Sequence, residues 1–339
     1  MNKIPSLINY TLFVLGILFP SSGPAIEINS HEPSPLNPTM SSLPQNLELR
    51  FDSVIEKDEA GQQYFSGPFG ISVGQDLRLY IADDLGHYIS IFDETFTLVQ
   101  KIGGKGKRPG ELAWVDAVVV DKHGKLYVAD TGNDRIQILD NMGKPLHHFG
   151  RRGTEPGRFR NPRGIALDSS GRMYVADWGN HRVQVFDGQG RFQNEFGGLG
   201  SEAGQFNNPL GIFVTQSDRI FVCDFKNHRI QAFEPSGKHL FSFGSEGAGP
   251  GQLRSPSGVT QDRWGHLYVA DFDNHRIQIF DRQGIFLRSF GQKGNSAGTF
   301  TNPTSVATDS RDRLHVVDKG NRRIQVFRIS TQGKIFPGD

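Results

Sequence analysis

Cysteine is almost absent from this sequence, since Cys223 is the only one among 339 residues. A disulfide within the chain is therefore excluded, and with it the class of small secreted domains that are stapled by such bonds. We expect Cys223 to be a small buried strand residue rather than a reactive thiol, because Ala or Val occupies its place in the other copies of the repeat described below.

Charge is scarce and balanced. Only 22% of the residues are charged, and the formal net charge is +1. Such a chain has no overall attraction for nucleic acid or for an acidic membrane, so an electrostatic partner must be held by a local patch. We therefore do not expect nucleic acid among its partners.

Long apolar segments are missing as well. The main apolar run, from Tyr10 to Phe19, is shorter than the ~20 residues that span a bilayer. It follows a short positive start and ends in small residues, which is the three-part pattern of a secretory signal. We predict a signal peptide over 1–25, a Pro/Ser-rich linker over 26–44, and a secreted or periplasmic protein without a transmembrane span after cleavage. An uncleaved membrane anchor is the alternative.

Glycine and internal repetition are abundant. There are 41 glycines without a collagen period, which indicates many tight turns. Segments such as LYVADTGNDRIQILD and MYVADWGNHRVQVFD occur six times in order. Their aspartates recur every 47 residues without an insertion, at Asp83, Asp130, Asp177, Asp224, Asp271 and Asp318. A fixed period of this length is the signature of a repeat architecture.

Each repeat has the pattern of four short strands separated by turn residues, which is typical of an antiparallel meander. One such sheet cannot bury both of its faces, but copies stacked face to face in a ring can. We predict an all-β fold, a six-bladed β-propeller of four-stranded antiparallel blades over 45–330, with a C-terminal tail over 331–339, and we expect a monomer. Residues 48–56 have the phase of a missing outer strand, so we predict that they complete blade six. Closure by the C-terminal tail is the alternative.

The repeated segments resemble the NHL repeat, which is named for an Asn-His-Leu stretch. The stretch occurs here as Asn180-His181-Arg182, Asn227-His228-Arg229 and Asn274-His275-Arg276. The resemblance covers about residues 48–328 and implies the propeller fold. It implies little about function, because propellers host many activities.

Two recurring features look chemical but are interpreted as structural. Each repeat aspartate is followed five residues later by an arginine in five of the six copies, as in Asp177 and Arg182. A charge-assisted hydrogen bond between them would fix the hairpin of every blade. His181, His228 and His275 stand at equal positions of neighbouring blades, too far apart for one metal ion with ligand bonds of ~2 Å.

The resemblance also implies two enzyme alternatives, a lyase that cleaves peptidyl-α-hydroxyglycine and a lactonase-like hydrolase. The lyase places zinc histidines where the first strand of a blade enters the central channel, and the hydrolase holds calcium there with oxygen ligands. In this sequence the six channel positions are Phe69, Asp116, Arg163, Leu210, Ser257 and Thr304. None is a histidine and only Asp116 is acidic, so we assign no catalytic residue, cofactor or metal ligand.

The candidate binding site is predicted on the side of the disc that carries the second-to-third loops and the interblade loops. There the residue after the repeat aspartate is aromatic in three consecutive blades, and basic residues gather before blade three. Aromatic and arginine side chains are common anchors of recognition surfaces. We expect a non-catalytic module that binds a protein, a peptide or a glycan, anionic ligands included. The alternative is an enzyme, a lyase or hydrolase, at the mouth of the channel. The candidate ligand-binding residues are Arg151, Arg152, Arg163, Trp178, Phe225, Phe272 and Asp116.

Overall fold

The computed structural model describes residues 47–331, which form six antiparallel sheets of four strands each. Blade one consists of β2 (Pro68–Val73), β3 (Leu79–Asp83), β4 (Tyr88–Phe92) and β5 (Leu98–Gly103). Blade two consists of β6 (Val115–Val120), β7 (Leu126–Asp130), β8 (Arg135–Leu139) and β9 (Pro145–Phe149). Blade three consists of β10 (Pro162–Leu167), β11 (Met173–Asp177), β12 (Arg182–Phe186) and β13 (Phe192–Gly197). Blades four and five consist of β14 (Pro209–Val214), β15 (Ile220–Asp224), β16 (Arg229–Phe233) and β17 (His239–Phe243); and β18 (Pro256–Gln261), β19 (Leu267–Asp271), β20 (Arg276–Phe280) and β21 (Phe286–Phe290). Blade six contains β22 (Pro303–Thr308), β23 (Arg313–Asp318), β24 (Arg323–Thr331) and β1 (Leu47–Ile55).

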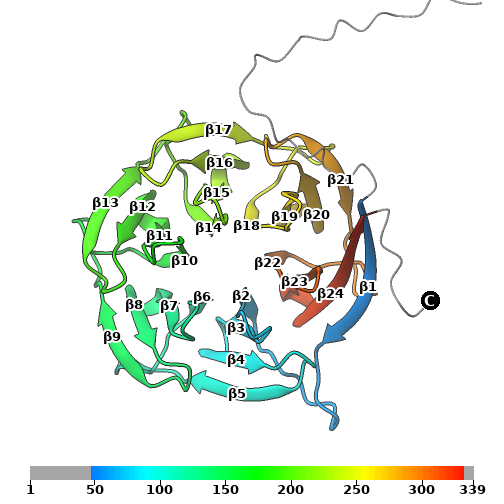
Figure 1. Ribbon diagram of the computed structural model, residues 1–339, viewed down its shortest axis with the longest axis horizontal. Coiled ribbons are helices and arrows are strands. Elements are labelled where there is room, and N and C mark those ends of the chain that lie inside the picture. The colour runs from blue at the N-terminus through cyan, green and yellow to red at the C-terminus, as the bar shows by residue number, and fades with distance from the viewer. Residues whose placement is uncertain (1–46, 332–339) are drawn as a thin grey trace, which may run out of the picture. The chain divides into compact units, whose positions relative to one another are not determined.

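The six blades form a ring around one axis, as predicted from the repeat (Figure 1). The first strand of each repeat is innermost, and each innermost strand contacts those of both neighbouring blades. Within a blade, consecutive strands pair antiparallel, with Asp177 at the end of β11 opposite Pro162 at the start of β10. The fold class and the number of blades are therefore confirmed.

Ring closure uses the N-terminal strand. β1 pairs antiparallel with β24 from Leu47 opposite Thr331 to Ile55 opposite Ile324, and it is the outer strand of blade six. The prediction for residues 48–56 is confirmed to within one residue. β24 is longer than the sequence indicated, because it continues past Arg328 to Thr331 along the partner strand. The predicted signal peptide, the linker over 26–44 and residues 332–339 of the tail lie outside the described residues.

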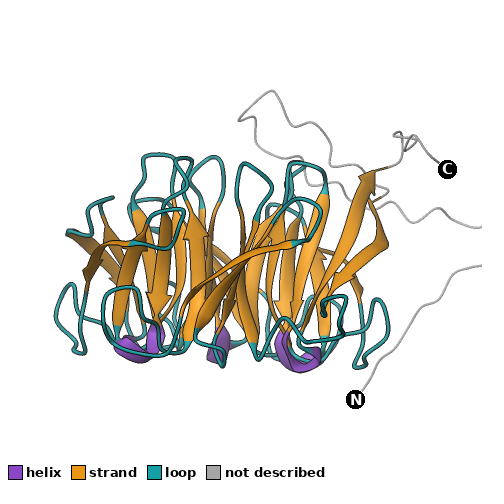
Figure 2. Ribbon diagram, turned by 90° about the horizontal axis from the view of Figure 1, so that it is seen from below, coloured by secondary structure: helices purple, strands orange, loops and turns teal. Residues whose placement is uncertain are grey.

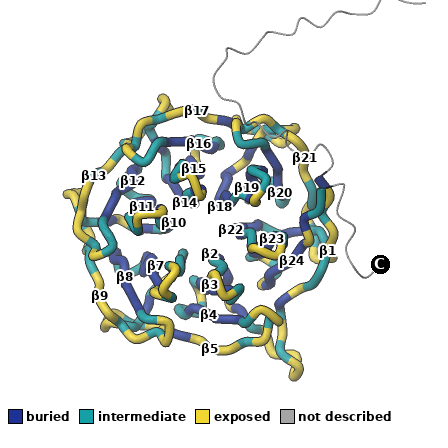
Figure 3. Tube along the Cα trace, viewed as in Figure 1, coloured by how far each residue is buried: buried dark blue, intermediate teal, exposed yellow. Residues whose placement is uncertain are grey.

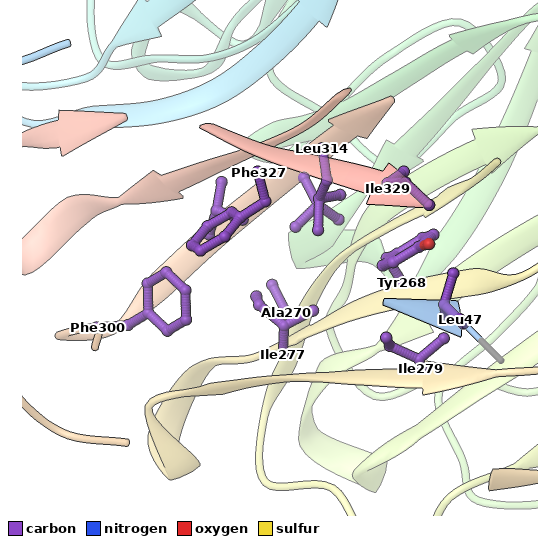
Figure 4. Close-up of a cluster of buried hydrophobic side chains, with 11 residues drawn as sticks. Leu47, Tyr268, Ala270, Ile277, Ile279, Phe300, Leu314, Phe327 and Ile329 are labelled. Atoms are coloured by element: carbon purple, nitrogen blue, oxygen red, sulfur yellow. The ribbon is translucent and has the colours of Figure 1, made fainter. Parts of the chain in front are cut away.

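The hydrophobic core is divided into six clusters, and each lies between two neighbouring blades. Figure 4 shows the cluster between blades five and six, where Tyr268 and Ile279 of blade five meet Phe327 and Ile329 of β24. Leu47 of β1 belongs to the same cluster. The exposed residues are concentrated on the outer strands (Figure 3). A blade therefore buries its faces only against its neighbours, which is the reason that the sequence needs a closed ring.

Buried aspartates hold the hairpins, as the sequence predicted. In blade three, Asp177 Oδ2 accepts hydrogen bonds from Asn180 Nδ2 at 2.8 Å, Arg182 Nε at 3.0 Å and Gln184 Nε2 at 3.0 Å. Its Oδ1 accepts one from the backbone N–H of Arg160 at 2.8 Å, so the same side chain fixes the interblade loop. Equivalent Asp–Arg ion pairs occur in blades two, four, five and six. Blade one lacks the arginine, and its Asp83 accepts hydrogen bonds from the backbone N–H groups of Ser66, Gly67 and Gly86.

The repeat histidines join neighbouring blades. Each follows a three-residue 3-10 helix and has a left-handed backbone, with φ of 56° at His181. Its Nδ1 accepts a hydrogen bond from the backbone of the next blade, Asn208 N–H at 3.1 Å. His87, His228 and His275 make the same bond, and Asp134 makes it with a carboxylate in blade two. A structural role therefore accounts for these histidines.

Glycines permit the close approach of the inner strands. An added Cβ on Gly164 would lie 2.2 Å from the carbonyl oxygen of Leu210, and one on Gly211 would lie 2.4 Å from that of Ser257. Neighbouring backbones thus touch next to the axis, where no side chain fits between them. The residue just before each of these glycines lies at the start of its inner strand.

The short helices η1 (Thr131–Asn133), η2 (Trp178–Asn180), η3 (Phe225–Asn227), η4 (Phe272–Asn274) and η5 (Lys319–Asn321) lie on one face of the ring, which we call the helical face (Figure 2). None of the helices within residues 47–331 is long and apolar enough to cross a membrane. Cys223 is fully buried in β15, and burial raises the pKa of its thiol, as expected for an unreactive strand residue.

Candidate functional site

Two side chains from every blade are placed at the axis on the helical face. The second residue of each inner strand forms what we call the strand ring, with Phe69, Asp116, Arg163, Leu210, Ser257 and Thr304. The first residue after each second strand forms the turn ring, with Asp84, Thr131, Trp178, Phe225, Phe272 and Lys319. The two rings are adjacent because the inner strand begins opposite the end of the second strand in every blade.

Contacts of Phe69 with two other blades, one of them not a neighbour, show how tightly these rings converge. The guanidinium carbon of Arg163, in blade three, lies 5.6 Å from the centre of the Phe69 ring in blade one. The ammonium group of Lys319, in blade six, lies 4.4 Å from the same ring. Phe69 is thus flanked by two cations that come from different sides of the axis.

Both cations are paired with carboxylates. Arg163 Nε lies 3.3 Å from Asp116 Oδ2, and Lys319 Nζ forms an ion pair with Asp84 Oδ2. The two pairs place four charges on one half of the rings, with no net charge among them. Their exposure is intermediate, since the side chains of Arg163 and Lys319 are 29% and 26% exposed. Solvent and small molecules can therefore reach the cations.

Asp116 is the deepest of these groups, with only 4% of its surface exposed. Burial raises the pKa of its carboxyl to about 6, and the nearby charge of Asp84 adds to the rise. Arg163 and Lys319 oppose that shift without cancelling it. Asp116 Oδ2 and Arg163 Nε are also buried polar atoms without a hydrogen-bond partner among the described residues, because their contact is not aligned as a hydrogen bond.

The other half of the turn ring is aromatic. The ring centres of Trp178 and Phe225 are 5.2 Å apart, and those of Phe225 and Phe272 are 6.2 Å apart. All three rings are half-buried, and Arg163 lies 4.5 Å from the centre of the Trp178 ring. We call these three residues the aromatic arc. The arc touches the charged half of the rings through Trp178, and the two halves form one continuous surface.

The structure brings together five of the seven residues that the sequence indicated. Asp116, Arg163 and Trp178 are in direct contact, and the arc continues from Trp178 to Phe225 and Phe272. The remaining two lie elsewhere. Arg151 and Arg152 are exposed and lie two and three residues after the end of the outer strand β9, and Arg152 lies 3.9 Å from Asp134. The basic loop therefore extends from the rim of the disc to its axis, and only Arg163 stands at the axis.

Four further residues at this end of the axis were not among the candidates. Asp84, Lys319 and Phe69 complete the charged half, and Trp114 is 58% exposed two residues before Asp116. Asp84 and Lys319 are 235 residues apart in the chain, yet they belong to neighbouring blades once the ring is closed. Treating the last and the first copy of the repeat as neighbours would have predicted that Lys319 and Asp84 lie close together.

Residues 47–331 contain no group of three or more His, Cys, Asp or Glu side chains that could hold a metal ion. The buried polar atoms without a hydrogen-bond partner at the axis are instead single carboxylate oxygens of Asp84 and Asp116 and the Nε of Arg163.

Comparison with known proteins supports the repeat assignment. Residues 159–186, 206–233 and 253–280, in three of the six blades, match the NHL repeat. No curated protein matches the chain. The whole propeller is similar to solved structures of diverse proteins, so their likeness indicates the fold alone.

Three of these structures illustrate that diversity. A gluconolactonase from Xanthomonas campestris has a TM-score of 0.62 at 15% identity, covering 86% of this chain and 94% of its own. An auxiliary nutrient binding protein from Bacteroides thetaiotaomicron has a TM-score of 0.63 at 16% identity, covering 84% and 76%. Virginiamycin B lyase from Staphylococcus aureus has a TM-score of 0.58 at 14% identity, covering 85% and 90%. Binding proteins and enzymes therefore share this architecture.

Proposed function

We propose that this chain, an NHL-repeat protein with a six-bladed β-propeller fold, is a non-catalytic binding module. Its ligand is a protein, a peptide or a glycan, held at the axis on the helical face by the strand ring and the turn ring. The proposal includes export to a secreted or periplasmic location and a monomeric state.

One observation carries the proposal: the copies agree on the scaffold and differ at the axis. The Asp–Arg pair that fixes the hairpin is the same in five blades. At the two axial rings, by contrast, the residues include acids, bases, hydroxyls and aromatic rings. Variation on a constant scaffold is what a binding surface requires, because specificity resides in a few side chains on rigid elements.

The half-buried state of the aromatic arc supports binding at this place. Trp, Tyr and Arg are the side chains that most often dominate recognition, and Trp178 with Arg163 above it provides both types at one point. Phe225 and Phe272 extend the apolar surface beside it. A ligand that covers the arc would remove these rings from water and gain the hydrophobic free energy of burial.

The test is capture of the ligand by the full chain, followed by measurement of affinity for three double variants. Trp178→Ala with Phe225→Ala should weaken binding by tenfold or more, about 1.4 kcal/mol. Arg151→Ala with Arg152→Ala should have little effect, because both lie outside the axial rings. Phe192→Ala with Leu240→Ala, on outer strands, is the matched control for loss of exposed apolar area. Full affinity in the axial variant, with the fold intact, would place the ligand elsewhere.

A second candidate function is catalysis by Asp116. The observation that favours it is the raised pKa of this carboxyl, about 6, which suits a group that exchanges protons near neutral pH. The captured ligand would be incubated with the parent chain and with Asp116→Asn and then analysed by mass spectrometry. Conversion by the parent and not by the variant would favour the enzyme over the binding module.

Export and oligomeric state have separate tests. N-terminal sequencing of protein recovered from the medium or the periplasm should begin near residue 24 or 26, in keeping with the signal pattern over 1–25. An intact Met1 in a soluble cytosolic fraction would contradict export. Light scattering of the purified protein should give the mass of one chain.

A further inference from the structure

We propose that the ligand of the axial site is a neutral saccharide, with hydroxyl groups at Asp116, Asp84 and Arg163 and the C–H face of a sugar ring on the aromatic arc. This inference rests on the binding function proposed above and specifies its ligand. Three features of the site carry it: the charge balance, the polar atoms without a hydrogen-bond partner, and the aromatic surface.

The charges at the axis cancel within the protein. Asp116 is paired with Arg163 at 3.3 Å, and Asp84 is paired with Lys319. An anionic ligand would gain attraction from the two cations and repulsion from the two acids, and a cationic ligand would experience the reverse. The residues that follow Phe225 and Phe272 repeat this balance, since Lys226 and Asp273 are both exposed and of opposite sign. A site with no net charge favours a ligand with none.

Three polar atoms at the site have no hydrogen-bond partner among the described residues. They are Asp84 Oδ1, Asp116 Oδ2 and Arg163 Nε. A buried polar atom without a partner is unfavourable, and a ligand that supplies the missing hydrogen bond removes that cost. The set contains two acceptors and one donor. A hydroxyl group donates one hydrogen bond and accepts others, so a polyol can satisfy both kinds of atom with one functional group.

Asp116 is the strongest of these observations, because it is only 4% exposed and its Oδ2 has no hydrogen-bond partner among the described residues. A hydroxyl that donates to this carboxylate would stabilise its charged form. The groups that face Asp116 are Arg163 of β10, Lys319 of η5, Asp84 after β3 and Thr131 of η1. Arg163 and Lys319 act on Asp116 through their charge and Thr131 through a hydrogen bond, while Asp116 Oδ2 has no hydrogen-bond partner among the described residues.

The aromatic arc provides the apolar part of the site. A sugar ring has one face of C–H groups and a periphery of hydroxyls, which matches an aromatic surface bordered by polar atoms. Trp178 and Phe225 are 5.2 Å apart and inclined by 58°, so they form an angled surface rather than a slot for a flat ring. Trp114 is a further exposed indole, 58% exposed, in the interblade loop just before β6.

The experiment uses the full chain and defined probes. Neutral oligosaccharides with glucose, xylose, mannose, galactose and N-acetylglucosamine units are titrated by calorimetry at low and at high salt. Polyglutamate and spermidine serve as the anionic and cationic probes. We expect at least one neutral saccharide to bind with an affinity that does not change with salt, because no ion pair to the ligand is screened.

Variants locate the binding. Trp178→Ala should reduce the affinity for that saccharide by about tenfold or more, whereas Trp264→Ala should leave it unchanged. Trp264 is the matched control, because it is also covered by an arginine, Arg263 at 4.6 Å, but lies in a turn between β18 and β19, away from the helical face. Phe225→Leu should retain part of the affinity, since it keeps apolar area and loses the ring.

Each remaining outcome overturns the inference. If no neutral saccharide binds, or if Trp178→Ala leaves the affinity unchanged, the ligand class is wrong. If only polyglutamate or spermidine binds, with an affinity that falls with salt and with Trp178→Ala, the ligand class is wrong while the axial binding function stands. Capture of the ligand by the full chain, with its affinity for the double variant Trp178→Ala and Phe225→Ala, tests that function independently.

Discussion

Asp116→Asn is expected to stabilise the folded propeller at neutral pH, although it removes half of an ion pair. Asp116 is 4% exposed, and the pKa of its carboxyl is raised from 3.8 to about 6, mainly by burial. At neutral pH the protein therefore holds a charge in a place that disfavours it. Asparagine has nearly the same shape and no charge. Arg163 loses its partner but keeps access to water, because its side chain is 29% exposed.

The magnitude follows from the difference in pKa between the folded and the unfolded chain. A shift of about 2 units corresponds to ~3 kcal/mol of destabilisation above pH 6, which is the upper limit of the gain in the variant. Because the folded-state pKa is the higher one, the folded carboxyl binds more protons than the unfolded one between pH 3.8 and about 6. The penalty is absent below the lower pKa, grows as the pH rises between the two values, and is complete above the higher one.

The assay is thermal unfolding of both proteins across the pH range. The other ionisable groups are common to the two, so the difference in Tm isolates residue 116. We expect no difference near pH 4 and a gain of up to ~10 °C above pH 7 in the variant. Asp273→Asn, at an exposed aspartate beside the turn ring, is the matched control and should change Tm little at either pH. A difference that is negative, or that does not depend on pH, would refute the reasoning.

Three other predictions concern the scaffold and can be measured by thermal or urea unfolding. Deleting 47–55 should prevent stable folding, because blade six loses its outer strand and two interblade clusters each lose a buried residue. Truncation after Thr331 should lower the stability far less. Asp177→Ala should cost ~3–5 kcal/mol, because Arg182 and Gln184 are left buried without their acceptor. His315→Tyr should reduce acid sensitivity: burial lowers the pKa of His315, so stability falls as the pH drops below 6.5, and other blades carry tyrosine there.

Each of these has an outcome that contradicts it. A lower Tm after truncation at 331 than after deletion of 47–55 would assign closure to the tail. A cost for Asp177→Ala no larger than that of Lys238→Ala, an exposed residue paired with Glu234, would show that the hairpin bonds contribute little. Equal losses of Tm between about pH 7.5 and pH 5.5 in the parent and in His315→Tyr would exclude His315 as the source of acid sensitivity.

The repeat period predicts the fold because every copy has the same strands, the same turns and the same buried aspartate. The aspartate series gives the number of blades, and the phase of residues 48–56 gives the closing strand, which the structure places as β1. The role of the histidines could not be predicted in the same way. Nδ1 of His181 accepts a backbone N–H of the next blade, and that contact depends on the left-handed backbone at His181 and on how two blades meet.

The site was predictable only in part, for a geometric reason. Trp178, Phe225 and Phe272 could be found because they occupy one position in consecutive copies. The pair of Lys319 and Asp84 could not be found along the chain, since the ring brings its last copy against its first. Arg151 and Arg163 are near in sequence, but the interblade loop carries the chain from the outer strand to the inner one, and so separates them.

The division of the core into six interblade clusters has a consequence for how such a protein can change over generations. A residue inside a cluster packs against the blade before it or the blade after it. A substitution there therefore requires a compensating substitution in the neighbouring blade. The second residue of each inner strand and the first residue after each second strand lie outside these clusters, although the hydroxyls of Thr131, Ser257 and Thr304 donate to a carbonyl group of the next blade. Mutation can therefore alter one axial side chain at a time, and new specificities can arise on this ring without passing through an unfolded ancestor.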